Sequence, residues 1–384
     1  MKLYSQRAGH LYHVQSDYDC FVPNSIKDIK INYDSEMILL LAEARASLGK
    51  LDGFAHDLPD KDIFIAKYVE KEAVLSSQIE GTQASLSDVF QFDKISGEKR
   101  KETQEVVNYV AALNYGVQLL NDLPISLRYL KAVHKELLKG VRGDGKNPGE
   151  IRHSQNWIGP NGCTLLTAAF VPPSVDKMQE CLFELENYIN SDEIYDDALI
   201  RIALIHYQFE TIHPFLDGNG RLGRLLIPLW LKEKKCLENP LLYLSLFFKM
   251  NRNEYYGLLM DVRFKGKFEE WIKFFLKGVI ETAESCIKTI QNIAALVKKS
   301  EESVACNSGK NRILLLESLK LFYKHPYFDT GDLIENLGIS KPTASSIVKF
   351  FLSLGMISPT SDKLRNATYR YDEYVAILEE GTEI

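Results

Sequence analysis

The chain has 384 residues, of which 45% are hydrophobic and 26% are charged. This length exceeds what one compact core usually needs, so two or three domains are expected, and the apolar content is sufficient to bury them. A formal net charge of -6 argues against a general binder of polyanions.

The cysteines and the first residues bear on the compartment. The sequence has six cysteines and no CxxC pair, which argues against a zinc site or a disulfide framework and favours free thiols. The beginning, MKLYSQRAGHLYHV, lacks the apolar run of a signal peptide. Other apolar runs, such as residues 225–231, are too short to span a bilayer. A soluble cytoplasmic protein without membrane contact is expected.

Helical periodicity begins after a weakly patterned segment, residues 1–35. Apolar side chains at helical spacing predict a helix from Ser35 to Leu48, which Gly49 and Gly53 are expected to end. A second helix is predicted over residues 61–78. Further helices are expected over residues 102–123, 123–141, 175–190 and 198–212.

The composition changes between residues 143 and 173, which are rich in Gly, Pro and Asn. Two strand-like runs, Asn156–Ile158 and Cys163–Leu166, are joined by Gly-Pro-Asn-Gly and predict a β-hairpin. Such a hairpin is often a surface feature without a partner. An open strand edge could also hold an extended peptide through main-chain hydrogen bonds.

The densest group of reactive residues is HPFLDGNGRLGR, residues 213–224. Its Gly-Asn-Gly run at 218–220 lets the backbone approach a ligand, and a helix is predicted over residues 222–231. Free N–H groups at a helix N-terminus bind anions. Arg221 and Arg224 lie on one face of the first turn, where cations are unfavourable unless an anion compensates them. The loop is therefore predicted to bind a polyphosphate.

Two further side chains of this loop supply chemistry. Asp217 offers one carboxylate beside the predicted phosphates, a common way of holding Mg²⁺. His213 titrates near neutral pH and can take a proton from an attacking hydroxyl. The set predicts phosphoryl or nucleotidyl transfer.

HPFLDGNGRLGR resembles, position by position, HPFx(D/E)GNGRxxR, the signature of the Fic family. The resemblance implies transfer of AMP from MgATP to a side-chain hydroxyl of a target protein, with release of pyrophosphate. It implies that His213 is the catalytic base, that Asp217 holds Mg²⁺, and that Arg224 clamps the γ-phosphate. The implied ATP-binding residues of the loop are Gly218, Asn219, Gly220, Arg221, Leu222, Gly223 and Arg224. Relatives that transfer phosphate instead tend to carry lysine at the position of Gly220, so the glycine favours AMP.

A second motif lies at the end of the predicted helix 61–78, where Ser76 to Gly81 reads SSQIEG. Locally the string indicates only a helix stopped by glycine. Beside the signature, it resembles the inhibitory (S/T)xxxE(G/N) motif of many Fic proteins. That resemblance implies that Glu80 pairs with Arg224 in the same chain, occupies the space of the γ-phosphate, and inhibits until it moves.

Other segments extend the resemblance. PGEIR (148–152), WIG (157–159) and FVPP (170–173) resemble the hairpin flap of Fic proteins, which implies that a target protein binds near Trp157–Gly159. Residues 241–263 resemble the segment that walls the adenine pocket, which makes Asn251 and Tyr256 the candidates for contact with the base. Residues 268–297 are expected to form one or two long helices.

The C-terminal part follows a polar string, residues 298–310, in which a domain boundary is predicted. Helices are expected over residues 313–323, 330–337 and 341–354, and strands over residues 355–357 and 367–371, with the tip of a wing at 361–366. This order resembles a winged helix-turn-helix, whose third helix would enter a major groove of DNA. The candidate contacts are Lys341, Thr343, Ser345, Ser346, Lys349, Lys363, Arg365 and Arg370. The charges of this part nearly balance, and winged helices also bind proteins, so DNA remains one of two alternatives.

The expected fold is mostly α, a Fic-type helical bundle with a β-hairpin flap plus a small C-terminal winged helix-turn-helix domain. The expected domains are an N-terminal helical segment with the inhibitory motif (1–100), the catalytic core (101–300) and the winged helix (309–378). The predicted function is an autoinhibited protein adenylyltransferase that uses ATP and Mg²⁺ and modifies Ser, Thr or Tyr. The alternative is a DNA-binding regulator whose Fic domain senses nucleotide. A homodimer and modification of the chain itself stay open.

Overall fold

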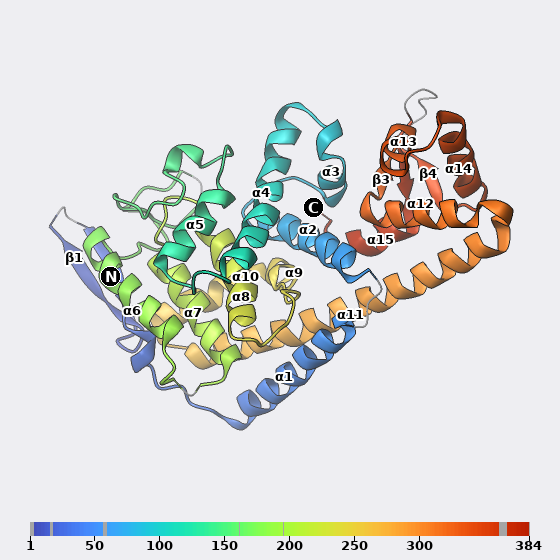
Figure 1. The fold of residues 1–384 in the computed structure, drawn as a ribbon. Coiled ribbons are helices and arrows are strands. Elements are labelled where there is room, and N and C mark those ends of the chain that lie inside the picture. Colours follow the sequence, from blue (N-terminus) through green and yellow to red (C-terminus); the bar gives the residue numbers. More distant parts are fainter. Residues whose placement is uncertain are drawn as a thin grey trace.

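The computed structural model describes residues 4–15, 18–56, 60–160, 162–194, 196–360 and 367–383. Most of these residues are helical, as predicted. Helices α1 to α10 form the larger body, and a smaller body lies at the far end of the long helix α11 (Figure 1). No helix in the described ranges is both long and apolar enough to cross a bilayer, and all six cysteines are free thiols.

The N-terminal residues form a hairpin that the sequence pattern did not indicate. Strands β1 (Gly9–Val14) and β2 (Tyr18–Pro23) pair antiparallel, with Gly9 opposite Pro23. Phe21 is fully buried, and its N–H donates to the carbonyl oxygen of Val171 at 3.0 Å. The hairpin is thereby joined to the FVPP segment of the predicted flap.

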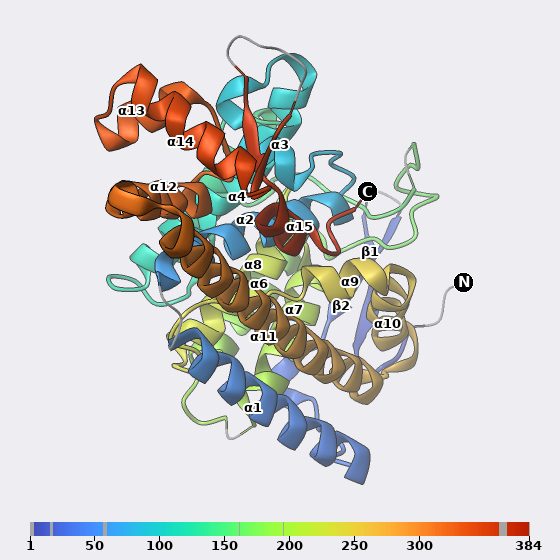
Figure 2. The same cartoon turned by 90° about the vertical axis from the view of Figure 1, so that its right-hand side faces the viewer.

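Helix α1 (Ser35–His56) runs through both glycines that were expected to end it, so that prediction is wrong. The helix lies along α11 (Phe268–Asn307) (Figures 1 and 2). Leu51, between the two glycines, and Ala55, after the second, are both buried. Burial of these side chains outweighs the cost of glycine in a helix, which is about 0.5–1 kcal/mol per residue.

Replacing either glycine with alanine is expected to stabilise the protein. A Cβ atom at Gly49 or Gly53 would have no heavy atom within 4 Å. Gly49→Ala and Gly53→Ala should therefore each raise the free energy of unfolding by about 0.5–1 kcal/mol, seen as a higher Tm. Gly223→Ala is the control that should lower the Tm, because its Cβ would lie 2.3 Å from Oε1 of Glu210. A fall in Tm for either α1 variant would contradict this account of the helix.

The helix that leads into residues 213–224 lies at the centre of the larger body. Every residue of α7 (Ala198–Ile212) from Leu199 to Ile212 is buried. The other helices of the larger body are α2 (Lys61–Ile79), α3 (Leu86–Phe90), α4 (Gly97–Leu119), α5 (Leu127–Leu137), α6 (Val175–Asn190), α8 (Asn219–Glu233), α9 (Ser245–Met250) and α10 (Arg252–Lys265). The predicted bounds of α6 and α7 are confirmed, whereas α4 begins five residues before the predicted 102.

The predicted flap hairpin is reduced to one bridge, between Ile158 and Phe170. The second strand expected at Cys163–Leu166 is wrong, because the N–H of Thr167 donates to the carbonyl oxygen of Thr164 at 3.0 Å and closes a turn there. Asn161, at the expected turn of the hairpin, lies outside the described residues.

The polar string 298–310 is helical as far as Asn307, because α11 continues through it. Ser300 and Val304 are buried there, and the hydroxyls of Ser300 and Tyr371 lie 2.6 Å apart. The smaller body then contains α12 (Arg312–Lys324), α13 (Thr330–Leu337), α14 (Lys341–Ser353) and α15 (Asp372–Glu379). Strands β3 (Tyr327–Phe328), β5 (Tyr369–Tyr371) and β4 (Ile357–Pro359) form a sheet in that order. The expected wing tip, with Lys363 and Arg365, lies outside the described residues.

Residues Glu380–Glu383, which we call the C-terminal clasp, return to the larger body beside α2. The ammonium group of Lys71 donates to the carbonyl oxygen of Glu380 at 2.6 Å. The side-chain amide of Gln78 donates to the carbonyl oxygen of Thr382 at 3.1 Å. Lys249 of α9 donates to the carbonyl oxygen of Glu383. The helix that carries the predicted inhibitory motif is therefore held from the C-terminal side of the chain.

Candidate active site

The loop 213–224 begins where α7 ends. His213 adopts a left-handed backbone (φ 51°, ψ 61°), which is uncommon for a residue with a side chain. Its carbonyl oxygen accepts hydrogen bonds from Arg152 Nε and Asn156 Nδ2, both at 3.1 Å. Gly218 is also left-handed (φ 74°) and precedes the first residue of α8. Residues of the predicted flap thus fix the turn from which His213 projects.

Asn219 holds this loop closed. Its Oδ1 accepts from the N–H of Phe215 at 2.9 Å, and its Nδ2 donates to the Phe215 carbonyl oxygen at 2.8 Å. The side chain is buried, and both its oxygen and its nitrogen are engaged in these two bonds. The predicted contact between Asn219 and phosphate would therefore be made by its backbone N–H, at the N-terminus of α8.

His134 of α5 supports the same loop, and sequence reasoning missed it. Its Nδ1 accepts from the N–H of Gly149 at 2.9 Å, so its Nε2 carries the hydrogen that is donated to the Asp217 carbonyl oxygen at 2.9 Å. Burial lowers the pKa of His134 to about 4, which keeps the ring neutral at pH 7. The histidine therefore joins the PGEIR segment to the loop without adding charge.

The expectation that His213 titrates near neutral pH is wrong, but its neutral imidazole can still accept a proton. Burial lowers the pKa of His213 to about 4, and the cations of Arg152 and Arg263 act in the same direction. The imidazole is therefore neutral at pH 7, the form that a general base requires. Its Nδ1 is buried without a hydrogen-bond partner among the described residues, so Nε2 is the nitrogen available to a substrate.

Arg224 is bound by the second motif. Its Nε donates to Oγ of Ser76 at 2.8 Å, and its Nη2 donates to the Ser76 carbonyl oxygen at 2.9 Å and to Oε1 of Glu80 at 2.7 Å. Burial opposes the charge of both partners, but their mutual attraction prevails. The pKa of Arg224 is raised and the pKa of Glu80 is lowered. Both the serine and the glutamate of the motif thus contact the arginine that was expected to bind the γ-phosphate.

Gly220 lies directly against Glu80. A Cβ atom at this position would stand 2.3 Å from Oε1 of Glu80 and 3.1 Å from Nη1 of Arg224. Only a residue without a side chain leaves room for the carboxylate in this position. The carboxylate occupies the N-terminal turn of α8, where an anion is favoured by the helix dipole.

Arg221 has a different partner, which the sequence did not indicate. It is buried, and its Nη1 donates to Oε2 of Glu105 in α4 at 3.2 Å. The same carboxylate oxygen accepts from Oγ1 of Thr82 at 3.1 Å, and Arg142 Nε lies 3.5 Å from its other oxygen. Nη2 of Arg221 lies 3.7 Å from Asp217. Glu105 therefore compensates the charge of Arg221.

Two of the predicted ATP-binding residues face away from the loop. Leu222 is fully buried in the hydrophobic core. Gly223 faces α7, where a Cβ atom would lie 2.3 Å from Glu210 Oε1 and 3.2 Å from Phe209. These placements do not fit the expected contact of either residue with ATP. Side chains three or four residues apart share one face of a helix, and Arg221 and Arg224 lie on the face of α8 that is turned toward the site.

The two candidates for base contact are separated. The guanidinium of Arg252 lies 5.5 Å from the ring centroid of Tyr256. Arg252 also donates to the carbonyl oxygen of Ile79, the residue before Glu80. Burial and the charge of Glu80 raise the pKa of Tyr256 to about 12. Asn251 instead donates from Nδ2 to the Phe247 carbonyl oxygen at 3.0 Å and lines a separate cavity. Tyr256 is therefore near the candidate site, and Asn251 belongs to a neighbouring one.

Asp217 is the one carboxylate of the loop. Its Oδ1 accepts from the N–H of Gly218 at 2.6 Å, and the side chain is 34% exposed. The described ranges contain no group of three or more His, Cys, Asp or Glu side chains placed to hold a metal ion. Asp217 therefore fits Mg²⁺ as a single protein ligand, with phosphate oxygens of a nucleotide supplying others.

Glu210 is a buried carboxyl group that sequence reasoning missed. It lies between α7 and α8, and its Oε1 has no hydrogen-bond partner among the described residues. Burial raises the pKa of Glu210 to about 7. Between about pH 4.5 and 7 the folded protein therefore keeps this proton, whereas the unfolded chain has lost it. The contribution of this proton to the stability of the folded state is lost as the pH rises through 7.

Glu210→Gln is expected to reduce this pH dependence. Because glutamine is neutral at every pH, the Tm of the variant should gain several degrees on that of the native chain between pH 5 and pH 8. Thermal unfolding across this range would measure the effect. Glu254→Gln, at an exposed position of α10, is the control and should leave the curve unchanged. Parallel curves for native chain and Glu210→Gln would show that the carboxyl is not protonated in the folded state.

Two protein-family models match successive segments of the chain. Residues 38–118 match the family model described as Fic/DOC family N-terminal, and residues 124–231 match the model described as Fic/DOC family. The first contains Glu80, and the second contains His213 to Arg224. The matched segments thus contain the two sets of residues that meet at Arg224.

Two curated relatives and one solved structure are similar to this chain. A protein adenylyltransferase Fic of Drosophila willistoni is 30% identical over 137 residues, 35% of this chain and 25% of the relative. One of Culex quinquefasciatus is 28% identical over 221 residues, 54% of this chain and 40% of the relative. The chain therefore spans two fifths or less of these relatives. A Fic family protein from Desulfovibrio desulfuricans G20 shares the fold, with a TM-score of 0.57 and 21% identity over 89% of this chain and 97% of that one.

Proposed function

The chain belongs to the Fic family, and from this we propose that it is an autoinhibited protein adenylyltransferase. It would move AMP from MgATP to a Ser, Thr or Tyr hydroxyl of a target protein and release pyrophosphate. The observation that carries the proposal is the arrangement of His213, the N-terminus of α8 and Arg224. A neutral base, free backbone N–H groups and a buried cation lie within one loop.

The chemical step needs a base and a site for negative charge. The target hydroxyl oxygen forms a bond to the α-phosphorus, the bond from that phosphorus to the bridging oxygen breaks, and pyrophosphate leaves. His213 takes the hydroxyl proton at Nε2. The N–H groups of α8 stabilise the charge on the phosphate oxygens. Mg²⁺, held by Asp217 and the nucleotide, would supply further positive charge for the phosphates.

Glu80 would act as the brake on this reaction. Arg224 commits Nε and Nη2 to Ser76 and Glu80, so Nη2 has no donor left for a γ-phosphate while α2 stays in place. The carboxylate also fills the space above Gly220. ATP would bind unproductively until Glu80 leaves, because two anions compete for one guanidinium.

The target protein would bind beside the flap. Trp157 is exposed, and its indole N–H donates to the Cys163 carbonyl oxygen at 3.1 Å, which fixes the ring at the surface. An extended segment of the target would lie along the backbone of Trp157, next to the bridge between Ile158 and Phe170.

The transferred group tests the proposal. Glu80→Gly should transfer label to protein from ATP labelled in the α-phosphate and not from ATP labelled in the γ-phosphate, in the presence of Mg²⁺. Transfer from the γ-label alone would mean phosphate transfer and would overturn the assignment of AMP.

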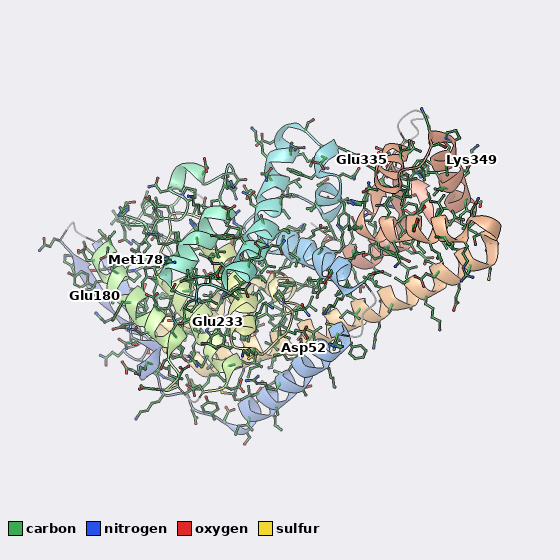
Figure 3. All side chains as sticks on the ribbon, viewed as in Figure 1. Asp52, Met178, Glu180, Glu233, Glu335 and Lys349 are labelled. Carbon is green, nitrogen blue, oxygen red and sulfur yellow. The ribbon has the colours of Figure 1, made fainter. Side chains whose placement is uncertain are left out.

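The smaller body carries the second candidate function, DNA binding by a winged helix. Helix α14 begins at Ser340, which caps it, and presents Lys341 and Lys349 to solvent. Exposed Glu335 lies on the neighbouring helix α13 (Figure 3), and Arg370 is paired with Asp372 at 2.7 Å. Gel-shift measurements with genomic fragments at moderate salt would test it, and no specifically retained fragment would count against DNA as the partner.

A further inference from the structure

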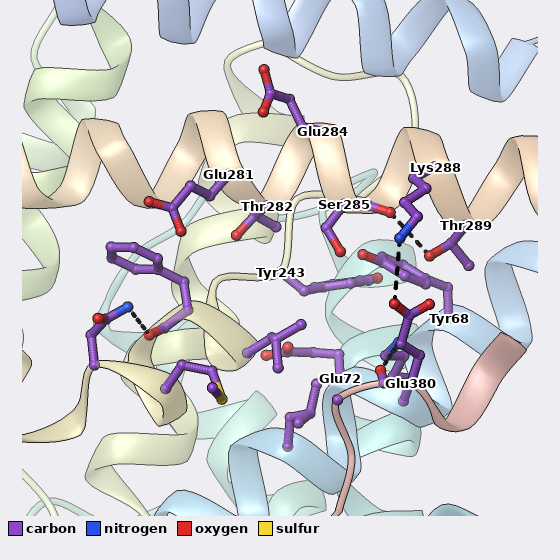
Figure 4. A pocket seen from close by; sticks show the side chains of 17 residues that line it. Tyr68, Glu72, Tyr243, Glu281, Thr282, Glu284, Ser285, Lys288, Thr289 and Glu380 are labelled. Carbon is purple, nitrogen blue, oxygen red and sulfur yellow. Dashed lines mark hydrogen bonds and ion pairs between the residues drawn. The ribbon is translucent and has the colours of Figure 1, made fainter. Parts of the chain in front are cut away.

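A cavity of about 520 Å³ lies between α2, α9, α11 and the C-terminal clasp (Figure 4). None of the residues 213–224 lines it, so it is separate from the candidate active site. Its apolar wall consists of Tyr68, Leu75, Tyr243, Leu246, Phe247 and Met250. The volume and the aromatic lining are those of sites that hold small organic molecules.

Three buried oxygen atoms of this cavity have no hydrogen-bond partner among the described residues. They are Oε2 of Glu72, the hydroxyl of Tyr243 and Oγ1 of Thr282. These residues are only 2%, 4% and 5% exposed. Buried polar groups are nearly always paired, because an unpaired one costs about 1–3 kcal/mol. Three of them in the lining of one cavity indicate a ligand that pairs with them.

Glu72 is placed to meet such a ligand with one oxygen. Its other oxygen, Oε1, accepts from the hydroxyl of Tyr109 at 3.1 Å and from the hydroxyl of Ser245. These two bonds fix the carboxyl group and leave Oε2 to the cavity. Figure 4 shows Tyr243 between Thr282 of α11 and Glu72 of α2.

The charges of the lining favour a cation. Four of the lining residues are glutamates and two are lysines. Both lysines interact with Glu380. Lys71 donates to its carbonyl oxygen at 2.6 Å, and Nζ of Lys288 lies 3.5 Å from its carboxylate. Glu281, Glu284 and Glu380 are exposed, and Glu284 points away from the cavity (Figure 4), so Glu72 is the buried acid of the lining. With both lysines already paired, the lining offers no free cation to an anionic ligand.

The aromatic rings favour the same ligand class. The rings of Tyr68 and Tyr243 have centroids 5.7 Å apart and are tilted by 36°. Their π faces can attract an ammonium group, and this attraction is stronger where water is excluded. A primary ammonium has three N–H donors, and the cavity offers three unpaired oxygens.

We propose that this cavity binds a small organic ammonium ion with an apolar or aromatic body. The ammonium group pairs with Oε2 of Glu72 and donates to the hydroxyl oxygens of Tyr243 and Thr282. The body packs against Leu246 and Phe247. This site is additional to the proposed transferase activity, and its test does not use that reaction.

Occupation of the site would act on α2. Glu72, Ser76 and Glu80 are four residues apart along the chain and therefore share one face of the helix. A ligand that binds the arrangement seen here stabilises that arrangement, including the contact between Glu80 and Arg224. Backbone amides of residues 72–80 should therefore exchange with solvent more slowly when the site is filled.

Calorimetric titration of the full chain with 2-phenylethylamine tests the site. The matched probes are 2-phenylethanol, which is neutral, and 3-phenylpropionate, which is anionic. The amine is expected to bind saturably and about ten-fold or more tightly than the alcohol, because a charged hydrogen bond contributes about 1.5–3 kcal/mol. The proposal is overturned if the amine does not bind at millimolar concentration, or if the alcohol or the acid binds equally well.

Two variants locate the binding. Glu72→Gln keeps the shape of the side chain and should weaken the amine about ten-fold or more. Tyr243→Phe removes an unpaired hydroxyl, so the ligand-free protein should be as stable as the native chain while the amine binds more weakly. Tyr129→Phe is the matched control, since it removes an unpaired buried hydroxyl outside the cavity. Equal weakening by Tyr129→Phe, or unchanged binding in Tyr243→Phe, would exclude this site.

Discussion

Glu80→Gly is expected to increase the transfer of label from α-labelled ATP to protein by about 5- to 150-fold over the native chain, the range of a coupling energy of 1–3 kcal/mol. The substitution removes the carboxylate that receives Arg224 Nη2 at 2.7 Å and that lies against Gly220. Arg224 remains anchored to Ser76 and gains a donor for the γ-phosphate. The rate of label incorporation at saturating ATP and Mg²⁺ is the measurement.

Glu80→Gln is the matched control for this prediction. Glutamine keeps the size of the side chain but loses the charge that attracts Arg224, so its rate should fall between those of the native chain and Glu80→Gly. Equal rates in the native chain and Glu80→Gly, with measurable transfer in both, would show that the contact between Glu80 and Arg224 does not inhibit.

His213→Ala, made in the Glu80→Gly chain, is expected to reduce the rate of AMP transfer by roughly 10²–10⁴-fold, as for the loss of a general base. The binding of ATP should be nearly unchanged, because the phosphates are held by α8 and Arg224 rather than by the imidazole. The affinity for ATP and the transfer rate would be measured separately. His10→Ala, at an exposed position of β1, is the control that should retain the full rate.

The pH dependence of kcat/KM is a second test of His213. Because burial lowers the pKa of His213 to about 4, the base stays deprotonated from pH 8 to well below pH 6. For Glu80→Gly, kcat/KM should therefore lack the decline that an ordinary histidine causes near pH 6.5. Suppose instead that kcat/KM declines near pH 6.5 and that the decline persists in variants of every other histidine. His213 would then have an ordinary pKa.

The parts of the site that local patterns determine were predictable. The apolar spacing of residues 198–212 and the glycines after Pro214 predicted a buried helix, a tight loop and a second helix, and α7 and α8 have this order. The anion-binding loop follows from glycines at a helix N-terminus, which depend on neighbours in sequence. The pairing of Glu80 with Arg224 came from family resemblance, because residues 144 positions apart leave no local pattern.

The parts that depend on tertiary contacts could not be predicted in this way. Glu105 meets Arg221 across 116 residues of chain, and nothing around Glu105 distinguishes it from other charged residues of its helix. Glycines 49 and 53 are ordinary stop signals, and only the contact of α1 with α11 overrides them. The N-terminal hairpin has the same explanation, since its buried face is defined by the segment around Val171.

The C-terminal clasp is translated long after helix α2, which it holds. Lys71 and the carbonyl oxygen of Glu380 are separated by 309 residues, and Gln78 and Thr382 by 304. Domains fold as units while the ribosome is still adding residues, N-terminal parts first. The loop 213–224 therefore leaves the ribosome well before the residues that hold α2. A nascent chain would pass through a period in which the catalytic residues are present and the helix bearing Glu80 still lacks its last support.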